Sequence, residues 1–172
     1  MRILLVGEYS NFHNSLKYGL EFLGHEVTIV GDGDGFKKYP VDIYVGSDFF
    51  DETKWLQKLR IGFWKLTGMD LVDRLKLSRF RESENHLKHY DIVQFINSNP
   101  FGCNHKTEWK MLNYLIQNNK KVFLVACGDD YEYANYLTEE HTGYSILESI
   151  EKKEQTKKDF QFTYKYLEPG YR

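Results

Sequence analysis

The sequence alternates short apolar runs of β character with segments of helical periodicity. Four runs are strong, at residues 3–6, 27–30, 92–96 and 122–125, and a weaker one lies at 41–45. Continuous apolar strands are typical of parallel sheets that are covered by helices on both faces. We therefore predict an α/β fold, a Rossmann-like doubly wound parallel sheet flanked by helices, which binds ligands at the carboxyl ends of its strands.

Two helices are predicted from apolar residues that recur at i, i+3 and i+4. The first is capped by Asn14 or Ser15 and ends at Gly24, which suits a left-handed C-terminal position. The second is capped by Thr107. Their apolar faces consist of Leu16, Leu20 and Leu23 in the first helix, and of Trp109, Leu112, Leu115 and Ile116 in the second.

The length of 172 residues suits one domain. Within it, residues 46–90 form a basic helical insertion, and residues 151–172 look like a tail that is cut before the fold is complete. The formal net charge of -2 gives no overall case for nucleic acid as a partner. The absence of a signal peptide pattern and of an apolar run of about 20 residues predicts a cytoplasmic protein.

The stretch "KWLQKLRIGFWKL" at residues 54–66 is amphipathic when it is read as a helix. Two interpretations are open: the apolar face packs on the sheet, or the helix lies on an anionic membrane surface. In the apolar face we place Trp55, Leu56, Leu59, Phe63 and Leu66. The residues expected at a membrane surface are Lys54, Trp55, Lys58, Arg60, Phe63, Trp64 and Lys65.

The first predicted strand ends at Gly7, where a dinucleotide-binding chain would continue with two more glycines. Here it continues "EYSNFHNS", so that fingerprint is absent, and no phosphate-binding loop of the GxxxxGK[ST] type occurs. Asp32, near the end of the second strand, therefore has little weight as a ribose ligand. The loop is instead polar, which fits a polyhydroxylated ligand or, alternatively, ordinary turn and cap chemistry. Its residues are Glu8, Tyr9, Ser10, Asn11, His13, Asn14 and Ser15.

Polar residues also follow the fourth and fifth strands. Asn97, Ser98 and Asn99 precede a proline, and they either form a turn or line the ligand site. After the fifth strand come Gly128, Asp129 and Asp130, whose carboxylates either cap a helix or orient or deprotonate a hydroxyl group.

No metal site is predicted. The stretch "DGDG" at residues 32–35 does not follow the EF-hand order and is interpreted as a turn, and His86 and His89 lack a third ligand. The two cysteines, Cys103 and Cys127, have neither disulfide nor zinc spacing.

Three stretches resemble a known family. "MRILLVGEYSNFHNSLKYGLEFLGHEVTIVGDGDGF", "HYDIVQFINSNPF" and "KKVFLVACGDDYEY" resemble the N-terminal domain of GT-B fold glycosyltransferases (glycosyl transferase group 1, family 4-like), over roughly residues 1–135. The resemblance implies two Rossmann-like domains that face each other across a cleft. This chain would be the acceptor-side domain, and the C-terminal domain that mainly binds the nucleotide sugar is absent from it.

The resemblance also implies roles for residues and partners. The catalytic residues would be Asp129 and His13, although the histidine that the family commonly carries after the fifth strand is replaced here by the Cys127 to Asp129 stretch. The acceptor would be a glycan or a lipid-linked molecule in polysaccharide biosynthesis at the inner face of a membrane, and no cofactor is expected. Cleft residues would be Gly7, Glu8, Tyr9, Ser10, Asn11, Asn97, Ser98, Asn99, Gly128 and Asp130.

A second hypothesis is a standalone binding or regulatory module of flavodoxin-like or receiver-like type, with strand order 2-1-3-4-5. The unfinished tail and the missing phosphate loop disfavour it. A nicotinamide-linked enzyme, the third hypothesis, is disfavoured by the missing glycines.

Overall fold

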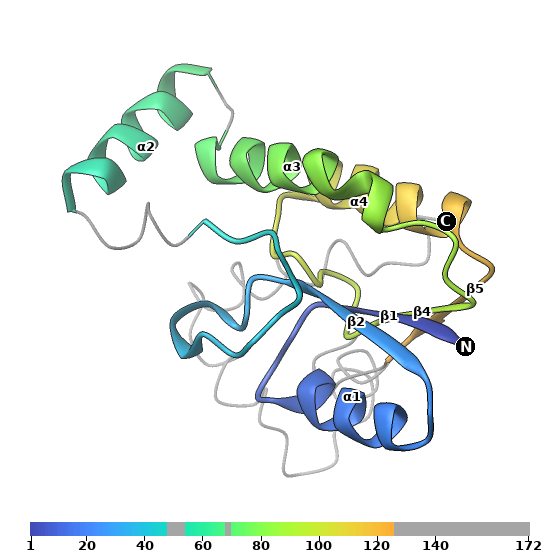
Figure 1. Cartoon of the computed structure of the whole chain (residues 1–172). Coiled ribbons are helices and arrows are strands. Elements are labelled where there is room, and N and C mark those ends of the chain that lie inside the picture. The colour runs from blue at the N-terminus through green and yellow to red at the C-terminus, as the bar shows by residue number, and fades with distance from the viewer. Residues whose placement is uncertain (48–53, 68–69, 126–172) are drawn as a thin grey trace, which may run out of the picture. The chain divides into compact units, whose positions relative to one another are not determined.

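The computed structural model describes residues 1–47, 54–67 and 70–125, which form one five-stranded sheet and the helices around it (Figure 1). All paired strands are parallel, which confirms the predicted α/β Rossmann-like fold. The strands are β1 (Arg2–Val6), β2 (Glu26–Gly31), β3 (Ile43–Tyr44), β4 (Ile92–Phe95) and β5 (Lys121–Leu124). The helices are α1 (Phe12–Phe22), α2 (Lys54–Thr67), α3 (Leu71–Ser83) and α4 (His105–Asn118), with short 3-10 turns at Gly35–Lys37 and Glu84–His86.

The strand order is β3-β2-β1-β4-β5. The chain builds outward from β1 to β3, and then returns through α2 and α3 to place β4 on the other side of β1. This order differs from the order 2-1-3-4-5 expected for a flavodoxin-like or receiver-like module. The strand order reverses between β1 and β4, and such a reversal point is where open α/β sheets bind ligands.

The helices cover both faces of the sheet (Figure 1). On one face, Leu16 and Leu20 of α1 pack against a cluster of Ile3, Leu5, Val27 and Ile29. On the other face, α3 and α4 contribute Phe80, Met111 and Leu115 to a larger core that includes Leu4, Val6 and Val93. Alternate residues of β1 thus face opposite layers, as the side-chain period of a strand requires.

The two predicted helices exist, but their starts were misplaced. Helix α1 begins at Phe12, and its cap position is Asn11 instead of Asn14 or Ser15. Gly24 has the predicted left-handed conformation, with a φ of 82°. Helix α4 is capped by Asn104, whose Oδ1 accepts a hydrogen bond from the Thr107 N–H at 3.1 Å. Three residues that were assigned to apolar faces, Leu23, Trp109 and Ile116, are exposed.

The predicted helical insertion is formed by α2 and α3, which pack against each other. Asp70 joins them: it accepts hydrogen bonds from Nε and Nη2 of Arg60 at 2.8 and 2.7 Å, and it caps α3 by accepting the Val72 N–H at 3.0 Å. Leu56 on α2 is buried, whereas Trp55, Leu59 and Leu66 of the same predicted apolar face are exposed. Of the two interpretations of this face, packing of the whole face on the sheet is therefore wrong for these three residues.

Residues 126–172 lie outside the described part of the chain. The predictions for Cys127, Gly128, Asp129 and Asp130, and for the tail at 151–172, fall there. In the described part, no helix is long and apolar enough to cross a membrane.

Candidate functional site

Gly7 brings the loops after β1 and β4 together at the carboxyl edge of the sheet. Its N–H donates to the Val30 carbonyl at 2.8 Å, and its φ of 83° lies in the left-handed region that favours glycine. A Cβ atom at this position would lie 2.6 Å from Cγ2 of Ile96 and 2.9 Å from Cβ of Pro100. The space beside the end of β1 is therefore filled by the β4 loop, so Gly7 serves close packing within the protein.

Glu8 turns inward and supports the start of α1. Its side chain is buried, and Oε2 accepts hydrogen bonds from the backbone N–H and the side-chain amide of Asn14 at 2.8 and 2.6 Å. This carboxylate satisfies an N–H group of the first helical turn that would otherwise lack a partner. The second oxygen, Oε1, is buried and has no hydrogen-bond partner among the residues described.

His13 is fully buried beneath the loop. Its Nδ1 lies 2.6 Å from the Gly7 carbonyl oxygen, and its Nε2 lies 3.3 Å from the amide nitrogen of Gln94. Burial lowers the pKa of His13, against the opposing effects of the Gly7 hydrogen bond and the Glu8 charge, so the ring is neutral near pH 7. The neutral tautomer that fits both contacts has Nδ1–H donating to Gly7 and Nε2 accepting from Gln94. This placement gives His13 a loop-positioning role, and the catalytic role predicted for it stays without support.

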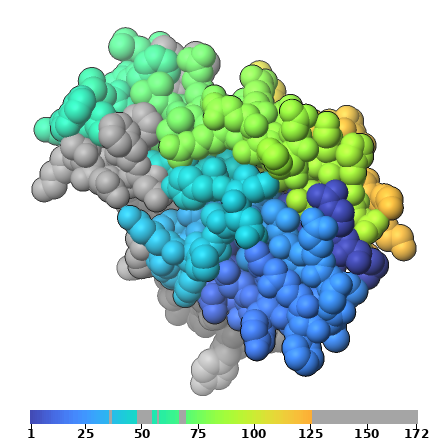
Figure 2. Space-filling model, in the orientation of Figure 1, coloured from blue at the N-terminus to red at the C-terminus, as the bar shows by residue number. Residues whose placement is uncertain are grey.

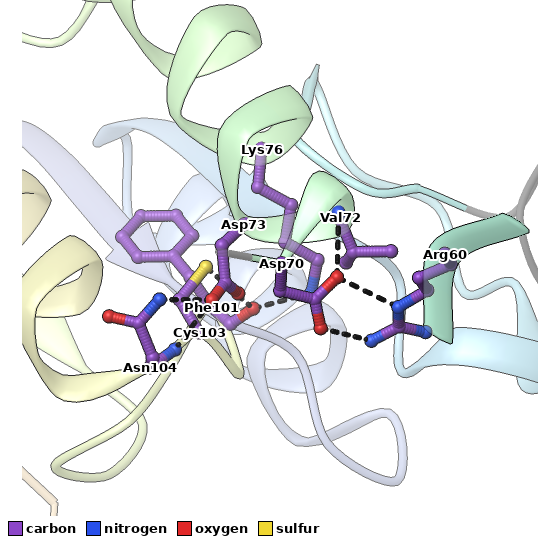
Figure 3. Close-up of polar contacts among 8 residues, drawn as sticks. All are labelled: Arg60, Asp70, Val72, Asp73, Lys76, Phe101, Cys103 and Asn104. Atoms are coloured by element: carbon purple, nitrogen blue, oxygen red, sulfur yellow. Dashed lines mark hydrogen bonds and ion pairs between the residues drawn. The ribbon is translucent and has the colours of Figure 1, made fainter. Parts of the chain in front are cut away.

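The buried side chain of Lys76 on α3 links the loop after β2 to the loop after β4. Its ammonium nitrogen lies 3.1 Å from Oδ2 of Asp32. It also donates to the Phe101 carbonyl at 2.5 Å (Figure 3). Burial acts to lower the pKa of Lys76, but the charge of Asp32 and its hydrogen bond outweigh burial and raise it. Lys76 is therefore a buried cation with a carboxylate partner.

The loop from Phe101 to Asn104 is held by two buried carboxylates. Glu108, in the first turn of α4, accepts the backbone N–H groups of Phe101 and Cys103 at 2.9 and 3.0 Å. Asp73 of α3 accepts the N–H of Asn104 at 3.3 Å and also its side-chain amide (Figure 3). Burial raises the pKa of Glu108 to about 7, although its two backbone hydrogen bonds oppose the shift. These contacts make the β4 loop a rigid support.

Tyr9 and Asn97 form the accessible part of this edge. Tyr9 is 38% exposed, and its pKa is raised chiefly by burial and less strongly by the Asp32 charge, whereas a hydrogen bond with the Asn97 side chain opposes the rise. Oδ1 of Asn97 accepts the Asn99 N–H at 2.9 Å, and Ser98 and Asn99 are exposed. The partly exposed side chain of Tyr9 thus lies beside the Asn97 amide, and the β4 loop also exposes Ser98 and Asn99.

Ser10 and Asn11 extend this surface toward the β2 loop. Both have left-handed backbones, with φ 52° and 66°. The Ser10 N–H donates to Oδ2 of Asp34 at 2.8 Å, and Lys37 contacts the same oxygen at 2.7 Å. Lys37 and Lys76 are therefore both ion-paired with carboxylates from the β2 loop.

The structure brings most of the predicted site residues to one edge, but at two depths. Gly7, Glu8 and His13 lie inside and build the loop. The surface layer consists of Tyr9, Ser10, Asn11, Asn97, Ser98 and Asn99. Sequence reasoning missed Glu108, and it treated Lys76 only as part of the basic helical insertion at residues 46–90. The i, i+4, i+8 spacing of Val72, Lys76 and Phe80, all buried on α3, is the signal that could have placed Lys76 inside.

The described ranges hold no group of three His, Cys, Asp or Glu residues that is placed to bind a metal ion. Comparisons with protein-family models, curated proteins and solved structures give no match for this chain.

Proposed function

We propose that this chain is the acceptor-binding domain of a GT-B type glycosyltransferase, and that the edge formed by the β1 and β4 loops binds a carbohydrate. The observation that carries the proposal is the partly exposed ring of Tyr9 beside Asn97, above loops that are fixed by buried hydrogen bonds.

Carbohydrate suits this surface for two reasons. A sugar presents C–H groups that pack on an aromatic ring and hydroxyl groups that exchange hydrogen bonds with amides and hydroxyls. The Asn97 side chain supplies such a group to Tyr9, and Ser10, Ser98 and Asn99 are exposed in the same two loops. Few, well-placed polar groups on a preformed support are typical of small-ligand sites.

A phosphate-bearing ligand suits it less well. Pyrophosphate binding needs open backbone beside the first strand, but Ile96 and Pro100 occupy that space at Gly7. The two lysines next to these loops, Lys37 and Lys76, are committed to Asp34 and Asp32. The support is therefore stronger for a neutral hydroxylated ligand than for a nucleotide.

In this proposal the reaction is divided between two domains. The donor nucleotide sugar is held by a domain outside this chain, and the domain described here presents the glycan or lipid-linked acceptor. An acceptor hydroxyl oxygen forms the new bond to the anomeric carbon, the bond from that carbon to the nucleoside diphosphate breaks, and the hydroxyl proton passes to a base. On the family resemblance alone, Asp129, which lies outside the described residues, is the proposed base. His13 suits this role less well, because both of its ring nitrogens are occupied. We place this activity on the cytoplasmic side of a membrane, with the protein peripheral to it.

Binding of the purified chain to a printed oligosaccharide array tests the site. We expect binding to a subset of glycans, and a loss of about tenfold or more in Tyr9→Ala and in Asn97→Ala, because each removes a contact from the accessible surface. Asn85→Ala is the matched control, since Asn85 is exposed on the 3-10 turn after α3. Absence of glycan binding, or equal binding by all four proteins, would contradict the proposal.

A further inference from the structure

Helix α2 has one side that is committed to the protein. Leu56 is buried, Phe63 is half-buried, and Arg60 forms the two-pronged ion pair with Asp70. Because these residues follow i, i+4 and i+7 spacing, they share one side of the helix. The Arg60 to Asp70 contact fixes the rotation of α2 relative to α3, and thereby decides which residues of α2 are exposed.

Next to this side, about a quarter of the way round the helix, lies an exposed apolar side. Trp55, Leu59 and Leu66 are 59%, 55% and 88% exposed, and their i, i+4, i+11 spacing places them together. In the space-filling view, α2 lies at the surface of the molecule, at the upper left (Figure 2). Exposed tryptophan and leucine in such a group mark an interaction surface, whereas single exposed apolar residues do not.

A row of lysines borders this apolar group. Lys58 and Lys65 are exposed and lie seven residues apart, on the side of the helix next to Trp55 and Leu66. The sequence of α2, KWLQKLRIGFWKLT, contains four basic residues and no acidic residue, in a chain whose formal net charge is -2. The surface is therefore both apolar and locally cationic.

We infer that α2 docks flat on the surface of a bilayer that contains anionic lipids. Trp55, Leu59 and Leu66 insert between headgroups, while Lys58 and Lys65 contact the lipid phosphates. Arg60, which sequence reasoning placed at the membrane, instead pairs with Asp70 at the start of α3, and Phe63 is half-buried.

The basic and apolar side chains of α2 together favour an anionic bilayer over other partners. A nucleic acid duplex would satisfy the lysines but would leave the apolar group in water, because its outer surface is phosphate. A second copy of the chain would bring a like-charged helix against the lysines. An anionic bilayer satisfies both features, since it offers phosphates above and acyl chains below. This inference does not depend on the proposed carbohydrate site.

Vesicle sedimentation with the whole chain tests the inference. We expect binding to phosphatidylglycerol-containing vesicles and little binding to pure phosphatidylcholine vesicles. Lys58→Gln with Lys65→Gln should weaken binding by about 25-fold, from about fivefold per lysine. Since these vesicles carry no glycan, the result is separate from that of the oligosaccharide array.

Helix α4 supplies matched controls, because it exposes Lys106, Trp109 and Lys110. Lys106→Gln with Lys110→Gln makes the same charge change, and Trp109→Ala matches Trp55→Ala. We expect these controls to bind vesicles like the wild type, whereas Trp55→Ala binds more weakly. Circular dichroism of each variant checks that it is folded.

A second measurement uses Trp55 as its own reporter. In a variant with Trp64→Phe and Trp109→Phe, the emission of the remaining tryptophan should shift to the blue when anionic vesicles are added. Two outcomes of the vesicle assay would overturn the inference: no binding to anionic vesicles, or a loss of vesicle binding in the α4 variants equal to that in the α2 variants. Two other results would also overturn it: tighter binding to duplex DNA than to vesicles, or a dimer that binds no vesicles and that Trp55→Ala dissociates.

Discussion

The ammonium nitrogen of Lys76 lies 3.1 Å from Oδ2 of Asp32 and 2.5 Å from the carbonyl oxygen of Phe101. One side chain of α3 thus joins the loops that follow β2 and β4. The two loops belong to strands that are separated by β1 in the sheet, so this contact sets the shape of the carboxyl edge.

Removing this cation should destabilise the protein. Lys76→Met leaves the Asp32 charge and the Phe101 carbonyl without their partner, and we expect a loss of about 2–4 kcal/mol in the free energy of unfolding. Adding Asp32→Asn to Lys76→Met should recover part of this loss. Urea unfolding measures both, with Lys110→Met on exposed α4 as the control. Equal stability of Lys76→Met and the wild type would show that the pair contributes nothing.

Gly7 should not tolerate a side chain. Gly7→Ala places a Cβ 2.6 Å from Ile96 at a φ of 83°, and we expect a cost of about 2–4 kcal/mol from overpacking and backbone strain. Gly19 lies in α1 with open space around its Cβ position, so Gly19→Ala should stabilise by about 0.5–1 kcal/mol. Thermal unfolding compares the two substitutions. A Gly7→Ala variant as stable as Gly19→Ala would refute the packing described at this loop.

Glu108 should make stability depend on pH. Its pKa is raised from 4.5 to about 7 in the folded protein, so the folded state holds a proton that the unfolded state has released between these values. The stabilising contribution is complete below about pH 4.5 and is lost as the pH rises through about 7, a change of about 3 kcal/mol. The difference in unfolding free energy between the wild type and Glu108→Gln should therefore fall over this range. A difference that rises with pH would mean that the pKa is lowered instead.

Asp70 should matter more as a helix cap than as an ion-pair partner. Asp70→Ala removes the acceptor for the Val72 N–H, and we expect a cost of about 1–2 kcal/mol. Arg60→Gln breaks only the partly exposed pair and should cost less than about 1 kcal/mol. Asp70→Asn keeps a capping oxygen and should resemble Arg60→Gln. The order of the three values in urea unfolding checks this, and a larger cost for Arg60→Gln than for Asp70→Ala would reverse the assignment.

The strands could be predicted from sequence because their signal is local. Each apolar run, such as residues 27–30, needs only its own composition to be recognised. The order of the strands could not be predicted from such local signals. It depends on which side of β1 the chain places β4 after it leaves β3. Helix α1 starts earlier than predicted because its cap chemistry involves Glu8, which reaches forward to Asn14.

The depth of the site residues could not be read from the loop sequence. Glu8, Tyr9 and Ser10 are consecutive and polar, yet only the first is buried, because the loop turns through a left-handed Ser10. On α2, the sequence left open whether the apolar face with Trp55 and Leu66 packs on the sheet or lies on a membrane surface. Their exposure follows from the Arg60 to Asp70 contact, a pairing across two helices that no periodicity reveals.

The central claim is that the β1 and β4 loops bind a neutral carbohydrate, and an NMR titration of the isotopically labelled chain tests it most directly. The ligands are lactose, maltose and diacetylchitobiose at millimolar concentration, with uridine diphosphate and NADH for comparison. We predict that at least one disaccharide shifts the backbone amide signals of Tyr9, Asn97 and Ser98, and that neither nucleotide does so. If no disaccharide moves these signals, or if a nucleotide moves them more strongly, the carbohydrate site is contradicted.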